Sequence, residues 1–167
     1  MRILETILLI LIFSLGMVTH GIITQLFYVD VQQPFPVSFK GFNSPERLSP
    51  GDHVVEDQIG VYNDKVVLDI DKPRWASFTD TNSMDPLIDA SSHGIEIVPK
   101  SVDDISIGDI ISYESSYTDG FVIHRVIEKG IDEEGAYFIL KGDNNSDEDP
   151  EKVRFDKIHG VLVAIIY

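Results

Sequence analysis

The sequence predicts an all-β domain of small coiled sheets in a barrel-like arrangement, preceded by one N-terminal transmembrane helix. Two observations predict it: an uncharged apolar run at residues 6–27 and, after residue 51, short apolar runs broken by Gly, Asn and Asp. We divide the chain into a membrane anchor at 1–27, a Pro- and aromatic-rich connector at 28–51 and a β-rich domain at 52–167.

Composition limits both the size of the fold and its chemistry. The 167 residues, of which 43% are hydrophobic, give room for one domain with a core. The chain has no cysteine, which excludes disulfides, thiolate nucleophiles and zinc–cysteine sites. Its formal net charge of -15 argues against nucleic acid as a partner, because the phosphates would be repelled.

The N-terminal apolar run is long enough to cross a bilayer. TILLILIFSLGMVTHGIITQLF holds 22 residues without a formal charge, and as a helix it would be roughly 33 Å long. Arg2 precedes the run and the next cation is Lys40. We therefore expect a single-pass protein of the cell membrane with a cytoplasmic N-terminus and an extracytoplasmic domain. A cleavable signal peptide is the alternative, with only weak small-residue pairs as cleavage sites: Ser14 with Gly16, and Thr19 with Gly21.

The connector leaves two interpretations open. Its aromatic side chains would either lie at the membrane interface or pack beneath the domain, and neither arrangement leaves a distinctive periodicity. The aromatic residues concerned are Tyr28, Phe35, Phe39 and Phe42. They are interleaved with four prolines, Pro34, Pro36, Pro45 and Pro50.

Beyond the connector we expect strands and hairpins and no soluble helix. QIGVYNDKVVLDI predicts a hairpin that turns at Asn63 and Asp64, and FVIHRVIE with AYFILK predicts another across GIDEEG. GDIISYE and GVLVAIIY predict single strands, of which the second closes the core.

Two side chains are candidates for catalysis. His124 lies in the middle of FVIHRVIE, where alternation places it between Val122 and Val126 on one face of the strand. The ring needs a partner, which a backbone carbonyl would supply in an ordinary core. Ser83, in the turn TNSMDP, is on its own a turn-former. The other histidines are predicted in the membrane span (His20), at the start of a strand (His53), before a turn glycine (His93) and before the last strand (His159).

Four short motifs follow one another along the predicted domain: SMDP at 83–86, GDIISY at 108–113, IHRV at 123–126, and KGDNN at 141–145 followed by Asp149. Each is weak alone. In this order and behind an anchor they resemble the successive motifs of type I signal peptidases, in the archaeal and endoplasmic-reticulum branch where histidine replaces the bacterial lysine. The resemblance covers about residues 77–167, and residues 29–70 have no counterpart in the family core.

The resemblance implies a serine endopeptidase that removes signal peptides from exported precursors. Ser83 falls at the nucleophile position and His124 at that of the general base. The family carries two aspartates six residues apart in this region. Asp149 matches the more stringently required aspartate. Asp143 matches the other, whose side chain would order the loop. These roles make physical sense, since a serine hydroxyl needs a neutral imidazole to take its proton and an aspartate fixes the tautomer of that ring.

The oxyanion formed on attack also needs donors. The backbone N–H of Ser83 is one candidate. The hydroxyl of Thr81 is another, because the bacterial branch uses a side-chain donor two residues before the nucleophile. Asn82 departs from the glycine that is common before this serine, although Asn tolerates left-handed backbone better than most residues.

We expect an extended precursor to add as a strand to an exposed sheet edge, where small pockets select small side chains. By analogy with the family, that edge consists of Ala76, Ser77, Phe78, Thr79 and Asp80. The expected partners are precursor proteins bearing signal peptides and the lipid membrane, and an association with the translocation machinery stays open. We expect no cofactor and no metal.

KGDNNSDEDP suggests a calcium loop as a competing interpretation, because oxygen-bearing side chains occupy every second position. An EF-hand loop counted from Asp143 needs glycine at its sixth position and glutamate at its twelfth. Those positions hold Glu148 and Arg154. A looser calcium site is left open.

A different class of function is a non-catalytic, membrane-anchored β module that binds exported segments. A protein without catalytic activity would have no reason to keep Ser83, His124 and Asp149 together, so the sequence speaks against this alternative. A self-cleaving repressor of the serine–lysine type fits neither the anchor nor the missing lysine.

Overall fold

The computed structural model describes three segments, residues 2–26, 31–34 and 48–167. The chain divides into two compact units, each described here by itself. The first comprises Met1–Val37 and Gly60–Val67, and the second comprises Ser38–Ile59 and Leu68–Tyr167. The aromatic residues of the predicted connector lie outside the described residues.

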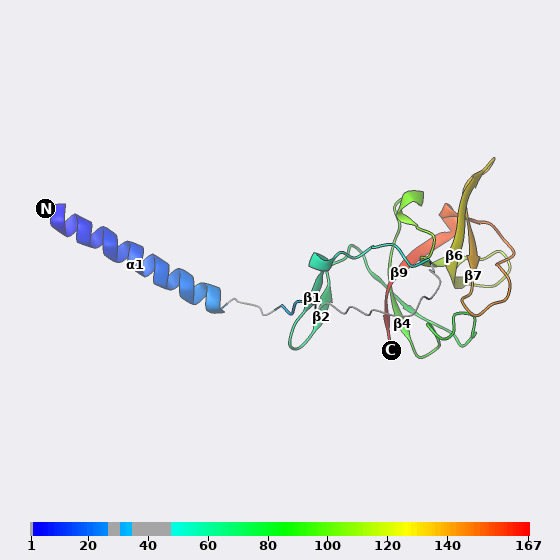
Figure 1. The fold of residues 1–167 in the computed structure, drawn as a ribbon, viewed down its shortest axis with the longest axis horizontal. Helices are drawn as coiled ribbons and strands as arrows, with labels where there is room; N and C mark the ends of the chain where they lie inside the picture. The colour runs from blue at the N-terminus through cyan, green and yellow to red at the C-terminus, as the bar shows by residue number, and fades with distance from the viewer. Residues whose placement is uncertain (1, 27–30, 35–47) are drawn as a thin grey trace, which may run out of the picture. The chain divides into compact units, whose positions relative to one another are not determined.

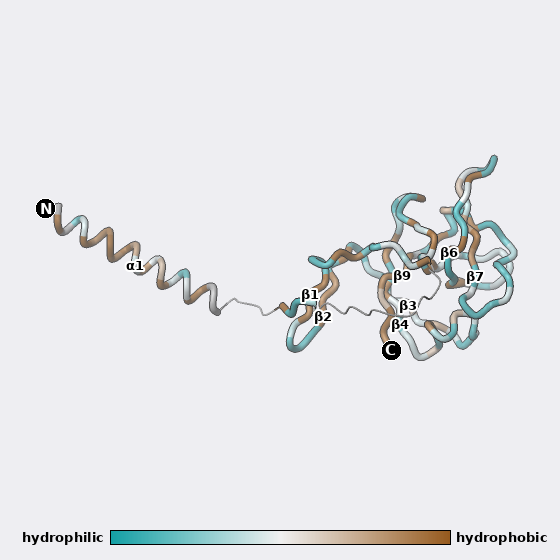
Figure 2. Tube along the Cα trace, viewed as in Figure 1, coloured by the Kyte–Doolittle hydropathy of each residue, from teal (hydrophilic) through white to brown (hydrophobic). Residues whose placement is uncertain are grey.

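Helix α1, Arg2–Leu26, contains the predicted membrane span. Its segment Glu5–Ile23 has a mean hydropathy of 2.2 and no buried residues, so by length and composition it is able to cross a membrane, as a signal sequence also is. The helix is largely brown in Figure 2. Two of its hydroxyls bond to the helix backbone, since Ser14 Oγ donates to Ile10 O at 2.8 Å and Thr19 Oγ1 donates to Leu15 O at 3.0 Å. These two hydroxyls therefore need no partner outside the helix.

The predicted hairpin at Asn63–Asp64 is confirmed. β1, Ile59–Val61, pairs with β2, Val66–Leu68, in a two-stranded sheet. The turn is closed by the Tyr62 N–H, which donates to Lys65 O at 2.9 Å.

The main sheet has seven antiparallel strands in the order β3-β4-β9-β5-β6-β7-β8 (Figure 1). Their bounds are β3 Arg74–Ser77, β4 His93–Ile97, β5 Ile110–Glu114, β6 Phe121–Asp132, β7 Gly135–Lys141, β8 Val153–Arg154 and β9 Ile158–Ile166. The all-β prediction is confirmed. Among the described strands the sheet is open, with β3 and β8 at its edges, and it does not close into a barrel.

The structure corrects three of the predicted histidine positions. His93 and Gly94 lie within β4, and His159 lies within β9. A side chain at Gly94 would lie 2.6 Å from Leu162 Cδ1, so this glycine marks a close approach inside a strand and not a turn. His53 opens no strand.

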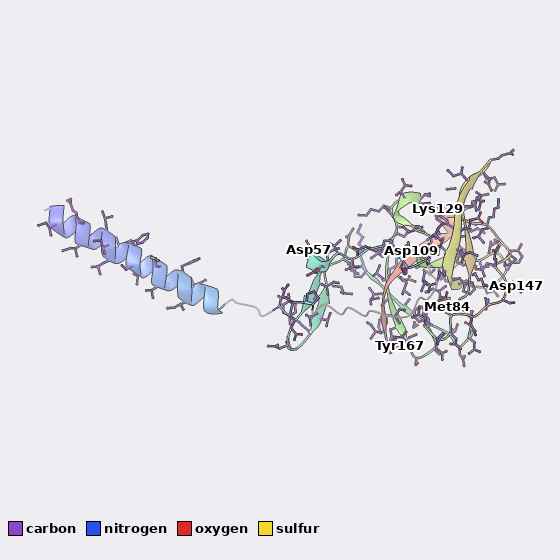
Figure 3. The ribbon with its side chains drawn as sticks, viewed as in Figure 1. Asp57, Met84, Asp109, Lys129, Asp147 and Tyr167 are labelled. Atoms are coloured by element: carbon purple, nitrogen blue, oxygen red, sulfur yellow. The ribbon has the colours of Figure 1, made fainter. Side chains whose placement is uncertain are left out.

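His53 lies in a loop where its Nε2 is 2.9 Å from Oδ2 of Asp109. Asp109 is 0% exposed, and its carboxylate also accepts the N–H groups of Gly51 and Ser106, each at 2.7 Å. Figure 3 labels this aspartate. A buried carboxylate requires hydrogen-bond donors, and the loop residues Gly51 and His53 provide two of them. These bonds fix the loop against Asp109.

The two faces of the sheet carry separate apolar clusters. One consists of Ile105, Ile111, Tyr113, Val126, Phe138, Leu140, Val153 and Val161, and the other of Met84, Ile88, Ile110 and Leu162. β5 contributes to both, which explains why its sequence does not alternate between apolar and polar residues. Met84, next to Ser83, is 2% exposed, so burial of its side chain fixes the turn that carries the serine.

Candidate active site

His124 is held by a buried carboxylate. It lies on β6 and is 8% exposed, and its Nδ1 is 2.8 Å from Oδ1 and 2.7 Å from Oδ2 of Asp149. A carboxylate only accepts hydrogen bonds, so Nδ1 carries the proton in the neutral ring. Nε2 then keeps its lone pair, which is the state a general base requires.

Tyr113 supports the same carboxylate. Its hydroxyl donates to Asp149 Oδ2 at 2.8 Å. Burial, and then the neighbouring Asp149 carboxylate, raise the pKa of Tyr113, so the hydroxyl stays protonated and continues to donate. The tyrosine belongs to the GDIISY motif, for which the sequence suggested no separate role.

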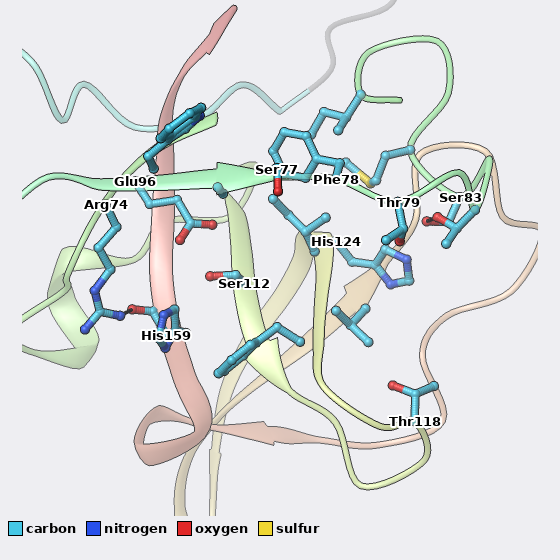
Figure 4. Close-up of a pocket in the computed structure, with 18 of the residues that line it drawn as sticks. Arg74, Ser77, Phe78, Thr79, Ser83, Glu96, Ser112, Thr118, His124 and His159 are labelled. Carbon is cyan, nitrogen blue, oxygen red and sulfur yellow. Dashed lines mark hydrogen bonds between the residues drawn. The ribbon is translucent and has the colours of Figure 1, made fainter. Parts of the chain in front are cut away.

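Ser83 begins a turn over residues 83–87. Asn82 before it has φ of 57°, the left-handed conformation that Asn tolerates, so its departure from glycine is accommodated. Ser83 Oγ lies 3.3 Å from Thr81 Oγ1. Ser83, Thr81 and His124 line one cavity of about 600 Å³. Figure 4 shows the hydroxyl of Ser83 on the side of the His124 ring.

The KGDNN loop holds the serine turn in place. The Asn144 N–H donates to Ser83 O at 2.9 Å, and its side-chain amide donates to Asn82 O at 3.0 Å. A side chain at Gly142 would lie 2.6 Å from Ser83 O, so the two loops approach closely only because this residue is glycine. Sequence reasoning missed this contact, because it joins residues far apart in the chain and leaves no local pattern.

Asp143 has a different partner from Asp149. Arg125 donates to it through two bonds, Nε to Oδ1 at 2.7 Å and NH2 to Oδ2 at 2.6 Å. NH1 of the same arginine donates to Gly108 O at 2.8 Å. The hydrogen bonds to Asp143 raise the pKa of Arg125. Arg125, in the IHRV motif, therefore joins the KGDNN motif through the bidentate pair and the GDIISY motif through the bond to Gly108.

The predicted substrate edge coincides in part with an edge strand. β3 is the terminal strand of the sheet, paired only with β4 in the sheet order. Four of the predicted residues line the cavity that holds Ser83: Ala76, Ser77, Phe78 and Thr79. Asp80 is not among the lining residues.

The carboxylates of KGDNNSDEDP bind different partners and do not converge on one point. Asp143 pairs with Arg125, Asp149 with His124, and Asp147 accepts a hydrogen bond from Ser146 Oγ at 2.6 Å. Within the described part of the chain, no three His, Asp or Glu side chains gather into a group that would hold a metal ion.

No protein-family model, curated protein or solved structure matches this chain. Ser83 and the carboxylate-bound His124 line one cavity at the edge of the β-sheet, and between these two described side chains there is no hydrogen bond, since Ser83 Oγ pairs with Thr81 Oγ1.

Proposed function

We propose that the protein is a membrane-anchored serine endopeptidase of the type I signal peptidase kind, which removes signal peptides from exported precursors. The observation that carries this proposal is the His124–Asp149 pair, 2.7 Å apart, in the wall of the cavity that Ser83 lines. The order of the four motifs along the chain supports it.

In this mechanism Ser83 Oγ attacks the scissile carbonyl while Nε2 of His124 takes its proton. Asp149 stabilises the imidazolium that forms, through the bond to Nδ1. The imidazolium then gives the proton to the leaving amine, and water attacks the acyl-enzyme by the reverse sequence of proton transfers. The cavity therefore provides both the nucleophile and its base.

The oxyanion would accept hydrogen bonds from the backbone N–H of Ser83 and the hydroxyl of Thr81. Thr81 Oγ1 is 3.3 Å from Ser83 Oγ. Its hydroxyl would therefore lie close to the substrate carbonyl group once that group has bonded to Ser83 Oγ. Removing one such donor typically costs about 3 kcal/mol of transition-state stabilisation. Asn144 supports this arrangement indirectly, since it fixes the carbonyls of Asn82 and Ser83.

The apolar helix α1 supports the membrane part of the proposal. Anchored there with a cytoplasmic N-terminus, the β domain would lie on the outer side, where precursors emerge during export. An extended cleavage site would pair with β3 at the sheet edge. Association with the translocation machinery would place the domain near those emerging segments.

The test is cleavage of a model precursor by the full chain in liposomes. Wild type should cut once, after a small residue, and Ser83→Ala and His124→Ala should be inactive. Ser91→Ala is the matched control, because Ser91 is an exposed loop serine outside the cavity.

A chelator should leave the rate unchanged. If Ser83→Ala cuts as well as wild type, or if chelator alone stops cleavage, the serine mechanism is wrong. If wild type binds the precursor without cutting it, the protein is the non-catalytic module instead.

A further inference from the structure

The cavity has a second, polar end, away from Ser83. Four polar residues line it: Arg74, Glu96, Ser112 and His159 (Figure 4). Glu96 is 2% exposed and Ser112 is 6% exposed. Among the described residues, Glu96 Oε1 and Ser112 Oγ are two of the three buried side-chain polar atoms that lack a hydrogen-bond partner. Buried polar atoms of this kind require an explanation.

Three neighbouring strands build this end of the cavity. Glu96 on β4 pairs with Leu162 of β9, and Ser112 on β5 pairs with Gly160 of the same strand. A side chain at Gly160 would lie 2.5 Å from Glu96 Oε2. The glycine therefore leaves room for the carboxyl group to lie over β9, on the side where Figure 4 shows Ser112.

The charges around Glu96 restrict what it would bind. Burial raises the pKa of its carboxyl group, whereas the Ser112 hydroxyl, His159 and Arg74 lower it. Ser112 is close enough to act on the carboxyl group, but the two side chains are not in hydrogen-bond geometry with one another. Arg74 is fixed there, since its NH1 donates to His159 O at 2.6 Å. Arg74 would repel a cationic group of a ligand, and the Glu96 carboxyl group would disfavour an anionic one. An uncharged group that both donates and accepts fits best.

We propose that this end of the cavity is a specificity subsite for an uncharged amide side chain, Gln or Asn, of the precursor. The amide N–H donates to Glu96 Oε1, and the Ser112 hydroxyl donates to the amide oxygen. The subsite rests on the proposed peptidase function. A site with unpaired polar groups discriminates strongly against an apolar analogue that leaves those groups without partners.

The subsite lies several residues from the cleaved bond. Arg74, which pairs with Glu96, is five positions before Thr79, near the serine end of the cavity. At the rise of a β-strand this corresponds to roughly 16 Å. A precursor whose scissile bond lies at Ser83 would therefore bring to this end of the cavity a side chain about four or five residues from that bond. Because β3 lies between the sheet edge and Glu96 on β4, that side chain would reach the subsite across the cavity face of β3.

The experiment uses the full chain in liposomes and precursors that carry Gln, Met or Lys at each of the six positions on either side of the cut. Met matches Gln in shape and lacks the amide. We expect one position at which Gln raises kcat/KM about tenfold over Met. Glu96→Met and Ser112→Ala should remove this preference while still cutting the Met precursor. Glu114→Gln, at an exposed residue of β5 outside the cavity, should keep it.

Each outcome has a distinct meaning. If wild type cuts the Met precursors and Gln gives no advantage at any position, or if the preference survives in both variants, the subsite is wrong and the peptidase proposal stands. A preference for Lys over Gln also overturns the amide assignment. If Glu96→Met does not fold, Ser112→Ala decides the question alone. If no precursor is cut, the peptidase proposal fails and the subsite falls with it.

Discussion

His124 Nδ1 lies 2.7 Å from Asp149 Oδ2, and both side chains are at most 10% exposed. Asp149 is further fixed by its own N–H, which donates to Leu140 O at 2.8 Å, and by the hydroxyl of Tyr113. The Asp149 backbone is thus fixed by Leu140 and its carboxylate by Tyr113, independently of His124, so the carboxylate is positioned to orient the imidazole.

This arrangement predicts that Asp149 and Asp143 respond differently to substitution. Asp149→Asn should lower kcat by about 10³–10⁴-fold, because the ring would adopt the wrong tautomer. Asp143→Asn should lower it far less and should lower the melting temperature, because it weakens the bidentate bond from Arg125. Asp147→Asn is the exposed control. Cleavage kinetics with thermal unfolding measure both effects, and equal losses of kcat for Asp143→Asn and Asp149→Asn would contradict the assignment.

Gly142→Ala should damage the serine turn. The added methyl would lie 2.6 Å from Ser83 O, so the turn must move, at a cost of about 1–3 kcal/mol in stability and a large loss of activity. Gly135→Ala is the matched control: its φ of 110° makes it strained too, but nothing lies within 4 Å of the added atom. The control should lose stability and retain cleavage per folded molecule. Full activity of Gly142→Ala would show that the KGDNN loop does not position Ser83.

Cleavage should fall on acidification, because only the neutral ring of His124 accepts a proton. The raised pKa of Tyr113 keeps its hydroxyl protonated through the alkaline range in which tyrosine ordinarily ionises, so it should add no alkaline limb there. The measurement is kcat/KM against pH. An acid limb that persisted unchanged in an active His124→Lys variant would show that another group causes it.

Glu96 should make stability depend on pH. Its folded-state pKa is raised above the ordinary value of 4.5, so the folded protein holds this proton when the unfolded chain has lost it. Stability therefore falls as pH rises from about 4.5 through the folded pKa. Glu96→Gln should raise the melting temperature relative to wild type at pH 7 and change it less at pH 4. Glu114→Gln should show no such difference, and the same shift in both variants would refute the effect.

The sequence predicted the hairpin of β1 and β2 from its turn residues, and it predicted β5, β6, β7 and most of β9 from short runs rich in apolar residues, since such runs report burial. It missed β4 because Gly94 within it resembles a turn residue, whereas the close approach of Leu162 and Phe78 requires glycine there. Register and sheet order arise from contacts between distant segments, which a local pattern does not contain.

The candidate site shows the same division. His124 stood out because a polar ring in an apolar strand needs a partner, and the resemblance pointed to Asp149. The roles of Tyr113, Arg125 and Gly142 appeared only when the strands were assembled, because each acts on a residue far away in the chain. Glu96 had no distinguishing signal, since one acidic residue in a strongly acidic chain is most simply a surface group.

The central claim, that Ser83 is the nucleophile, is tested most directly with Ser83→Cys. The chain has no cysteine, so this variant carries a single thiol. We predict that Ser83→Cys cuts a model precursor at the same bond as wild type, more slowly, and that N-ethylmaleimide abolishes its activity while wild type and Ser91→Cys are unaffected. If alkylated Ser83→Cys still cuts the precursor, Ser83 is not the nucleophile and the serine peptidase account is wrong.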